Sequence, residues 1–109
     1  MATRIFGQVG KLKKEKIQEY RELHANAWPG VLETIRKCHL EHYSIFIQGS
    51  LVFSYYEYTG EDYERDMELM AADPVTQEWW KHTQPCFETY AVSPDSEFYH
   101  DMEQIFYLQ

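Results

Sequence analysis

The chain has 109 residues, of which 44% are hydrophobic, and a formal net charge of −8 at pH 7. A chain of this length builds one core, so we expect a single domain over residues 1–109. The excess of acidic residues argues against binding to nucleic acid or to anionic membrane surfaces, because both kinds of binding require clustered lysine or arginine. The sequence has no long apolar stretch of the kind that spans a membrane and no signal-peptide core, which predicts a soluble cytoplasmic protein.

The first predicted elements are a strand and a broken helix. Residues 4–12 alternate loosely between apolar and polar side chains, which is typical of a strand. Apolar residues then recur at helical spacing from residue 13 to about residue 38. Pro29 has no N–H to donate and disfavours a helical residue before it, so we expect a break that falls beside His24.

The middle of the chain predicts a β-hairpin. Residues 42–48 and residues 51–58 are rich in β-branched and aromatic side chains. Gly49 lies between them and suits a tight reversal, so the two segments should pair as neighbouring antiparallel strands.

The second half of the chain predicts two helices and a closing strand. Thr59 is expected to cap the first helix, whose acidic residues, Asp66 among them, are interpreted as a solvated face. Asp73 followed by Pro74 is a start signal for the second helix. Residues 103–109 are apolar enough for a closing strand, although they alternate poorly.

This order of elements predicts an α+β fold. Strand, helix, strand, strand, helix, strand is the ferredoxin-like split β-α-β sandwich. One face of such a sheet takes both helices, and the other would carry tyrosine, phenylalanine and isoleucine side chains that nothing in this chain covers. A second copy packed sheet to sheet would cover them, so we expect a homodimer that forms a dimeric α/β barrel.

His24 is the first candidate functional residue. Tyr20, His24 and Trp28 are four residues apart and would share one helix stripe, with the proline break beside them. A reactive imidazole in an aromatic pocket is one interpretation. A hydrogen-bonded structural histidine is the alternative, and the spacing leaves both open.

Three further aromatic residues are candidates for a ligand site. Trp79 and Trp80 are neighbours on a helix and point about 100° apart, so one should be buried and the other should line an opening. Indole faces suit the C–H side of a sugar ring, although a pure packing role is as good an interpretation. Tyr43 could offer its hydroxyl to a ligand or close the edge of the core.

Metal binding finds little support in the pattern. His39 and His42 lack an acidic or thiol partner at matching spacing, so no metal site is expected. Cys38 and Cys86 also lack metal or redox spacing and are expected to be free thiols.

Four segments together resemble the L-rhamnose mutarotase family: EYRELHANAWPGV, HYSIF, ADPVTQEWW and QIFYL. The resemblance implies a ferredoxin-like dimer that interconverts the α and β anomers of a 6-deoxy sugar pyranose without a cofactor. It places His24 at the family's catalytic histidine. It also places Tyr20 and Tyr43 at the sugar-contacting tyrosines, and Trp79 and Trp80 at the sugar-contacting tryptophan pair.

The chemistry of mutarotation suits these residue types. Ring opening removes a proton from the anomeric hydroxyl and gives one to the ring oxygen, and an imidazole can serve in either transfer. The chain departs from the family at Gly30, where an acid is usual, and at Phe98 and Tyr99, in a stretch that often holds tryptophan. L-rhamnose and L-fucose both remain open as substrates. The alternatives are a dimeric α+β barrel oxygenase acting on aromatics or haem, and a non-catalytic sugar-binding module.

Overall fold

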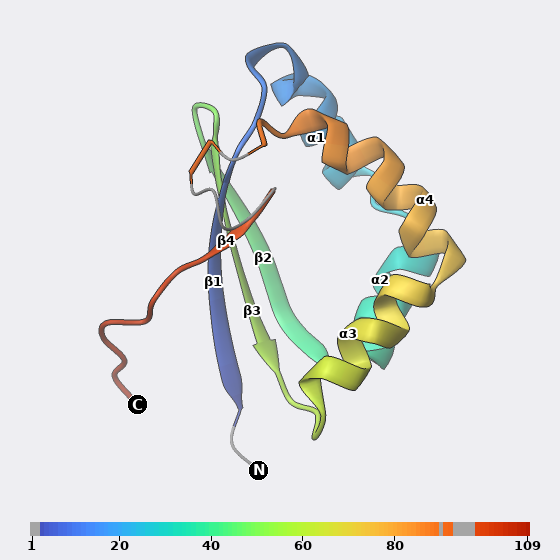
Figure 1. Cartoon of the computed structure of the whole chain (residues 1–109), viewed down its shortest axis with the longest axis vertical. Coiled ribbons are helices and arrows are strands. Elements are labelled where there is room, and N and C mark those ends of the chain that lie inside the picture. The colour runs from blue at the N-terminus through green and yellow to red at the C-terminus, as the bar shows by residue number, and fades with distance from the viewer. Residues whose placement is uncertain (1–2, 90, 93–97) are drawn as a thin grey trace.

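The computed structural model describes residues 3–89, 91–92 and 98–109. In this part of the chain, a four-stranded antiparallel sheet in the order β2-β3-β1-β4 is covered on one side by four α-helices (Figure 1). The strands are β1 (Arg4–Lys11), β2 (Leu40–Gln48), β3 (Leu51–Tyr58) and β4 (His100–Asp101). The helices are α1 (Ile17–Ala25), α2 (Pro29–Lys37), α3 (Tyr63–Ala72) and α4 (Pro74–Thr83), with 3₁₀ turns η1 (Lys14–Lys16) and η2 (Gln84–Cys86). The predicted α+β, ferredoxin-like fold class is confirmed.

The centre of the sheet follows the predicted strand pattern. β1 pairs with β3 over its whole length, from Arg4 opposite Tyr58 to Lys11 opposite Leu51. β2 and β3 form the expected hairpin, and Gly49 at its turn has a φ of 61°. That left-handed conformation is readily accessible to glycine, which explains why the reversal is at this residue.

The predicted helix break is also confirmed. α1 ends at Ala25, one residue beyond His24, and α2 begins at Pro29. Trp28 is extended, with φ −70° and ψ 135°, as expected for the residue before a proline. Proline costs nothing at the first helical position, because the N–H it lacks would have no partner there. The break therefore holds His24 in the last turn of α1.

The start of α3 differs from the sequence-based expectation. Asp62, and not Thr59, caps the helix, because its carboxylate accepts a hydrogen bond from the backbone N–H of Arg65. Thr59 instead donates its hydroxyl to the backbone oxygen of His39. Both residue types can cap a helix, and the chain reversal after β3 decides which of them lies at the helix end.

Asp66 was expected on a solvated face but is buried, with 2% of its surface exposed. Its Oδ2 accepts a 2.5 Å hydrogen bond from the hydroxyl of Tyr58 and lies 3.0 Å from His39 Nδ1. These two partners, the Tyr58 hydroxyl first, lower the pKa of Asp66 below its ordinary value. Buried charges are found where such partners exist, and the spacing of acids along a helix does not reveal them.

The predicted closing strand over residues 103–109 is wrong. The fourth strand is His100–Asp101, which pairs with Gln8 and Val9 of β1. After the backbone N–H of Met102 donates to the oxygen of Gly7, the chain leaves the sheet on the side away from the helices (Figure 1). The apolar residues that follow run consecutively instead of alternating, and Ile105 is 88% exposed.

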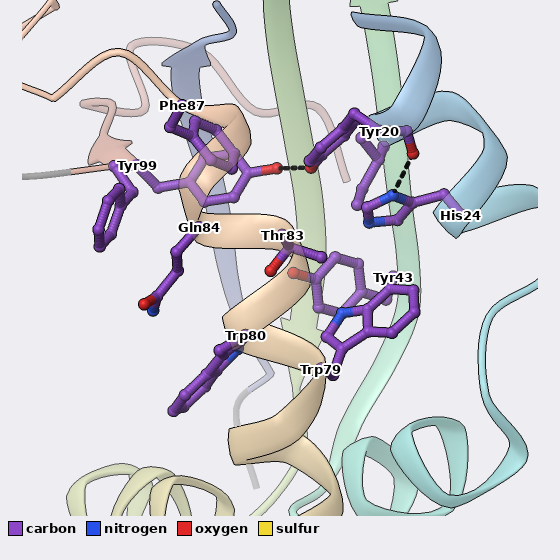
Figure 2. A pocket seen from close by; sticks show the side chains of 11 residues that line it. Tyr20, His24, Tyr43, Trp79, Trp80, Thr83, Gln84, Phe87 and Tyr99 are labelled. Atoms are coloured by element: carbon purple, nitrogen blue, oxygen red, sulfur yellow. Dashed lines mark hydrogen bonds between the residues drawn. The ribbon is translucent and has the colours of Figure 1, made fainter. Parts of the chain in front are cut away.

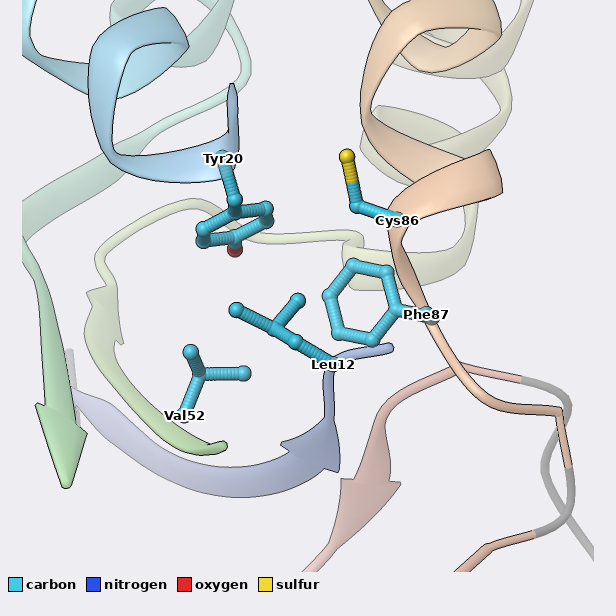
Figure 3. Packing of buried hydrophobic residues seen from close by; sticks show 5 residues of the cluster. All are labelled: Leu12, Tyr20, Val52, Cys86 and Phe87. Carbon is cyan, nitrogen blue, oxygen red and sulfur yellow. The ribbon is translucent and has the colours of Figure 1, made fainter. Parts of the chain in front are cut away.

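The core consists of two clusters on the helix side of the sheet. The first contains Leu12, Tyr20, Val52, Cys86 and Phe87 (Figure 3). The second contains Leu40, Tyr56 and Tyr58, against which Tyr63, Met67 and Met70 of α3 pack as predicted. Both cysteines are buried free thiols.

The other face of the sheet carries no helix (Figure 1). Phe46 of β2 is 63% exposed and Leu51 of β3 is 37% exposed. No helix within the described ranges has the length and apolar character needed to cross a membrane.

Candidate active site

His24 is held in the last turn of α1 with one ring nitrogen bound to the backbone. Its Nδ1 lies 2.9 Å from the backbone oxygen of Tyr20 (Figure 2). A carbonyl oxygen can only accept, so Nδ1 carries the hydrogen and Nε2 of the neutral ring keeps its lone pair. Burial lowers the pKa of His24 below its ordinary value, and the bond to Tyr20 opposes this to a smaller extent. Near pH 7 the ring is therefore neutral and can accept a proton through Nε2.

The paired indoles come from α4. The carboxylate of Asp73 accepts a hydrogen bond from the backbone N–H of Thr76 and fixes the start of this helix. Trp79 is 7% exposed, and its ring centroid lies 5.3 Å from that of His24 in an edge-to-face arrangement. Trp80 is half-buried. The expectation that one indole is buried and the other lies more open is met, and both line the same cavity.

Trp28 does not join the predicted helix stripe. The rings of Tyr20 and His24 lie against each other, tilted by 33° with centroids 4.2 Å apart, as four-residue spacing implies. Trp28 lies beyond the helix break, and its ring meets Trp79 at 5.1 Å and His82 at 5.4 Å. Trp79 therefore stands between His24 and Trp28 and holds the imidazole from a second side.

Tyr43 lies on β2 beside a β-bulge. The register of β2 against β3 shifts between Glu41 and Ser44, where two residues of β2 oppose the single residue Tyr56. His42 takes up the extra residue with a φ of 51°, in the left-handed region. Tyr43 alternates with Ile45 and Ile47, which pack against the first core cluster, so it lies on the helix side of the sheet with its ring 5.2 Å from that of Tyr56. The extra residue returns Leu40, which is 4% exposed, to the same side. Bulges are frequent beside active sites.

Two tyrosine hydroxyls meet at the wall of the cavity. The hydroxyl of Tyr20 in α1 lies 2.7 Å from the hydroxyl of Tyr99, just before β4 (Figure 2). The Tyr99 ring packs edge-on against Phe87 with centroids 5.0 Å apart. Burial raises the pKa of both phenols, and also that of Tyr43, whose hydroxyl is enclosed although the residue as a whole is 38% exposed. All three hydroxyls are protonated at neutral pH.

The structure brings all five sequence-predicted site residues to one cavity of about 340 Å³, within the usual range of ~300–1,000 Å³ for small-ligand sites. Its lining comes from α1, β2, α4 and the chain that follows α4 (Figure 2). The lining residues are Tyr20, His24, Tyr43, Ile45, Trp79, Trp80, Thr83, Gln84, Phe87, Phe98 and Tyr99.

Part of this lining was missed from the sequence. Thr83 and Gln84 follow Trp79 and Trp80 by four residues, so helical spacing could have indicated them. Tyr99 lies outside any periodic element, and only the folded chain brings it to Tyr20.

The described lining offers hydroxyl, amide, indole and imidazole groups, and no carboxylate, lysine or thiol. Among the described residues, no group of three or more histidine, cysteine, aspartate or glutamate side chains is arranged to hold a metal ion. His39 and His42 instead lie 3.0 Å from Asp66 and 3.1 Å from Glu57, respectively. The titratable groups that the described lining offers for proton transfer are thus His24 and the tyrosine hydroxyls.

A second, larger cavity of about 840 Å³ adjoins the first. His24, Tyr43 and Trp79 line both cavities, and the second one extends to the polar side chains of Arg36, Glu41 and His42. The imidazole therefore stands at the boundary between an aromatic chamber and a more polar one.

The sheet topology defines a small protein of the dimeric α+β barrel fold class, with one imidazole in its aromatic cavity. A family model described as L-rhamnose mutarotase matches residues 5–108. An L-rhamnose mutarotase of Shouchella clausii is 32% identical over 103 residues, which cover 92% of this chain and 93% of that protein. The chain belongs to the L-rhamnose mutarotase family and is an isomerase that acts on carbohydrates.

Two solved structures share the fold. The crystal structure of an L-rhamnose mutarotase from Formosa agariphila has a TM-score of 0.75 at 24% identity and covers 97% of this chain and 99% of that one. A NIPSNAP family protein from Agrobacterium tumefaciens has a TM-score of 0.64 at 17% identity, with coverages of 96% and 89%. At these identities the two likenesses establish the fold alone.

Proposed function

We propose that this protein interconverts the α and β anomers of a 6-deoxy-L-sugar pyranose, with L-rhamnose as the first candidate and L-fucose as the second. The observation that carries the proposal is the convergence of His24, Tyr20, Tyr43, Trp79 and Trp80 on one cavity of monosaccharide scale. Family membership supports the same reaction class.

His24 is the proposed general base of ring opening. Its neutral Nε2 takes the proton of the anomeric hydroxyl, that oxygen becomes the aldehyde oxygen, and the bond between C1 and the ring oxygen breaks. The electron pair of this bond stays on the ring oxygen, which takes a proton from a second group. Rotation about the C1–C2 bond and reversal of both transfers close the ring as the other anomer.

The rate required of the site is modest, because mutarotation proceeds unaided in water. Positioned proton transfer contributes about 10²- to 10⁴-fold, which is sufficient for a site of this simplicity. Neither transfer calls for a metal or an organic cofactor, and none is proposed.

Trp79 and Trp80 are the proposed platform for the apolar C–H face of the sugar ring, and Tyr20 and Tyr43 are the proposed hydroxyl contacts. Indole faces favour such C–H surfaces, and the hydroxyls can pair with sugar hydroxyls inside a partly dry cavity. Trp79 serves a second purpose in this proposal, since its contact with His24 limits the movement of the imidazole.

A homodimer is proposed from the bare face of the sheet. Apolar residues on it include Phe46, at 63% exposed, and a second copy packed sheet to sheet would cover them. Light scattering coupled to gel filtration should give twice the mass of the 13.1 kDa chain, and a monomer at micromolar concentration would contradict this. We further propose that residues 1–109 form one mutarotase-like domain that works in the cytoplasm.

Saturation-transfer NMR on a panel of L- and D-sugars tests the proposed function. We expect faster exchange between the anomers of L-rhamnose, with L-fucose as the next best sugar. Sugar binding without faster exchange would favour a non-catalytic binding module. A Soret band on haem titration, together with no acceleration on any sugar, would favour the oxygenase alternative.

A further inference from the structure

The proposed mechanism needs a second group that protonates the ring oxygen. The paired hydroxyls of Tyr20 and Tyr99 are the candidates for this group. We propose that Tyr20 is this acid and that Tyr99 is its positioning residue, which donates its hydroxyl hydrogen to Tyr20 Oη. The inference rests on the proposed mutarotase function and extends it to Tyr99.

The first support is the place of Tyr20 relative to the base. Its ring lies against that of His24 with centroids 4.2 Å apart, and both residues line the same cavity. In a hemiacetal, the anomeric oxygen and the ring oxygen are bound to one carbon. A base and an acid that serve them must therefore approach one carbon together, which adjacent side chains on one helix face can do.

The second support is the direction of hydrogen bonding between the two phenols. Their oxygens are 2.7 Å apart, so one hydroxyl donates to the other. If Tyr99 donates, the hydrogen of Tyr20 remains available to the cavity. Although burial raises the pKa of both residues, the bond to Tyr99 lowers the pKa of Tyr20, whereas the bond to Tyr20 raises that of Tyr99. With the bond in this direction, the Tyr20 hydroxyl is the one that can give its proton to the sugar.

The third support is the change in this bond during the reaction. When Tyr20 gives its proton to the ring oxygen, its own oxygen becomes a phenolate, and the hydrogen bond from Tyr99 becomes charge-assisted. An interaction that strengthens as charge develops lowers the barrier, whereas one of constant strength only aids binding. On ring closure Tyr20 takes its proton back from the sugar hydroxyl, and His24 returns the other, so the site ends in its starting state.

The packing of Tyr99 makes it suitable for this role. It is held edge-on against Phe87, which is 3% exposed and also packs edge-on against Tyr20 at 5.4 Å. One buried ring therefore orients both phenols, and the two hydroxyls meet at the cavity wall (Figure 2). Such a shared support keeps the donor in line with the oxygen that becomes charged.

A double-mutant cycle tests this inference, with kcat and KM for L-rhamnose anomer exchange measured by NMR. We expect Tyr20→Phe to lower kcat by about 100-fold or more. Tyr99→Phe should lower kcat by about 10- to 100-fold, the range for losing a hydrogen bond to a charged group, with KM changed less than about threefold. In the Tyr20→Phe background, Tyr99→Phe should change kcat by less than about twofold, since Tyr99 acts through Tyr20.

Tyr63→Phe is the matched control. It removes one hydroxyl of the Tyr56–Tyr63 pair, whose oxygens are also 2.7 Å apart, and neither residue lines the cavity. This variant should keep wild-type kcat. If Tyr99→Phe proves unstable on melting, Tyr99→Gln and Tyr99→Leu replace it, and the amide donor of glutamine should retain several-fold more kcat than leucine.

The contrary results distinguish a failure of the proposed function from a failure of this inference alone. A wild-type protein that does not accelerate anomer exchange would refute the proposed function and this inference with it. An active wild type refutes the inference alone in any of three cases: Tyr99→Phe leaves kcat unchanged, it raises only KM, or it lowers kcat equally in both backgrounds. The last result would mean that Tyr99 acts independently of Tyr20.

Discussion

Gly10 of β1 should be irreplaceable for steric reasons. A Cβ added to Gly10 would lie 2.7 Å from Phe87 Cε1 and 2.9 Å from the backbone oxygen of Phe98. Phe87 is 3% exposed and packs against both Tyr20 and Tyr99, so it cannot move without disturbing the cavity wall. Interiors are close-packed, and an extra methyl group there forces side chains or backbone out of place.

We expect Gly10→Ala to lower the free energy of unfolding by about 1–3 kcal/mol, the usual cost of overpacking a core. In a domain of this size, each 1 kcal/mol shifts the melting temperature by roughly 4–8 °C. Urea titration and thermal melting, both followed by circular dichroism, measure the two quantities. Anomer exchange should also slow, because Phe87 orients two residues of the cavity.

Gly7→Ala is the matched control on the same strand. A Cβ at Gly7 would meet only Met102 Cε, at the ordinary contact distance of 3.6 Å, and neither glycine has a positive φ. This variant should be within about 0.5 kcal/mol of wild type or slightly more stable, because alanine restricts the unfolded chain. Equal destabilisation by the two substitutions would refute the steric reasoning.

Three further predictions address the site. Because burial lowers the pKa of His24 and the proposed base must be neutral, kcat/KM should fall as the imidazole becomes protonated, with the midpoint of the fall below the ordinary histidine value of about 6.5; a midpoint above that value would contradict this. His42 has a φ of 51°, in the left-handed region that a β-branched residue strongly disfavours. We therefore expect His42→Val to be about 1–2 kcal/mol less stable than His42→Gly and to bind sugar more weakly. Equal unfolding midpoints of the two variants in urea would contradict this. Trp79→Ala should cost about 3–5 kcal/mol in urea unfolding, whereas Trp80→Ala should leave stability nearly unchanged and raise KM several-fold, and the reverse pattern would contradict the proposed division between the indoles.

The parts of the fold that the sequence predicted correctly depend on local chemistry. Gly49 at the hairpin turn, Pro29 at the helix break and the Asp73–Pro74 start of α4 each act through their own backbone or side chain. Alternation over β3 likewise needs no knowledge of its neighbours, since its inward residues are buried and the residues between them are not.

The errors concern features that depend on distant partners. Asp66 is buried because Tyr58 and His39 reach it from the sheet side, and nothing in the spacing of acids on α3 reports those contacts. The last strand is at His100 and Asp101 because β1 offers an edge there, whereas the apolar residues after it alternate poorly and form no strand pairing with the described residues.

In the candidate site too, local spacing predicted some residues, and contacts between distant segments determined the others. Helical spacing pointed to Tyr20 and His24 together and to the opposed directions of the two indoles. The bulge at His42 could not be foreseen, because a register shift arises between two strands and not within one. The family resemblance marked Phe98 and Tyr99 as a departure, but the pairing of Tyr99 with Tyr20 could not be foreseen, since 79 residues separate them along the chain.

The central claim is that His24 carries the anomeric proton, and the rate of anomer exchange in a His24→Ala variant at saturating L-rhamnose tests it most directly. His82→Gln, which changes a histidine outside both described cavities, controls for the loss of an imidazole. We expect His24→Ala to lose about 100-fold or more in kcat, with sugar affinity within a few-fold of wild type and His82→Gln fully active. Wild-type exchange rates in His24→Ala, with L-rhamnose still bound, would contradict it.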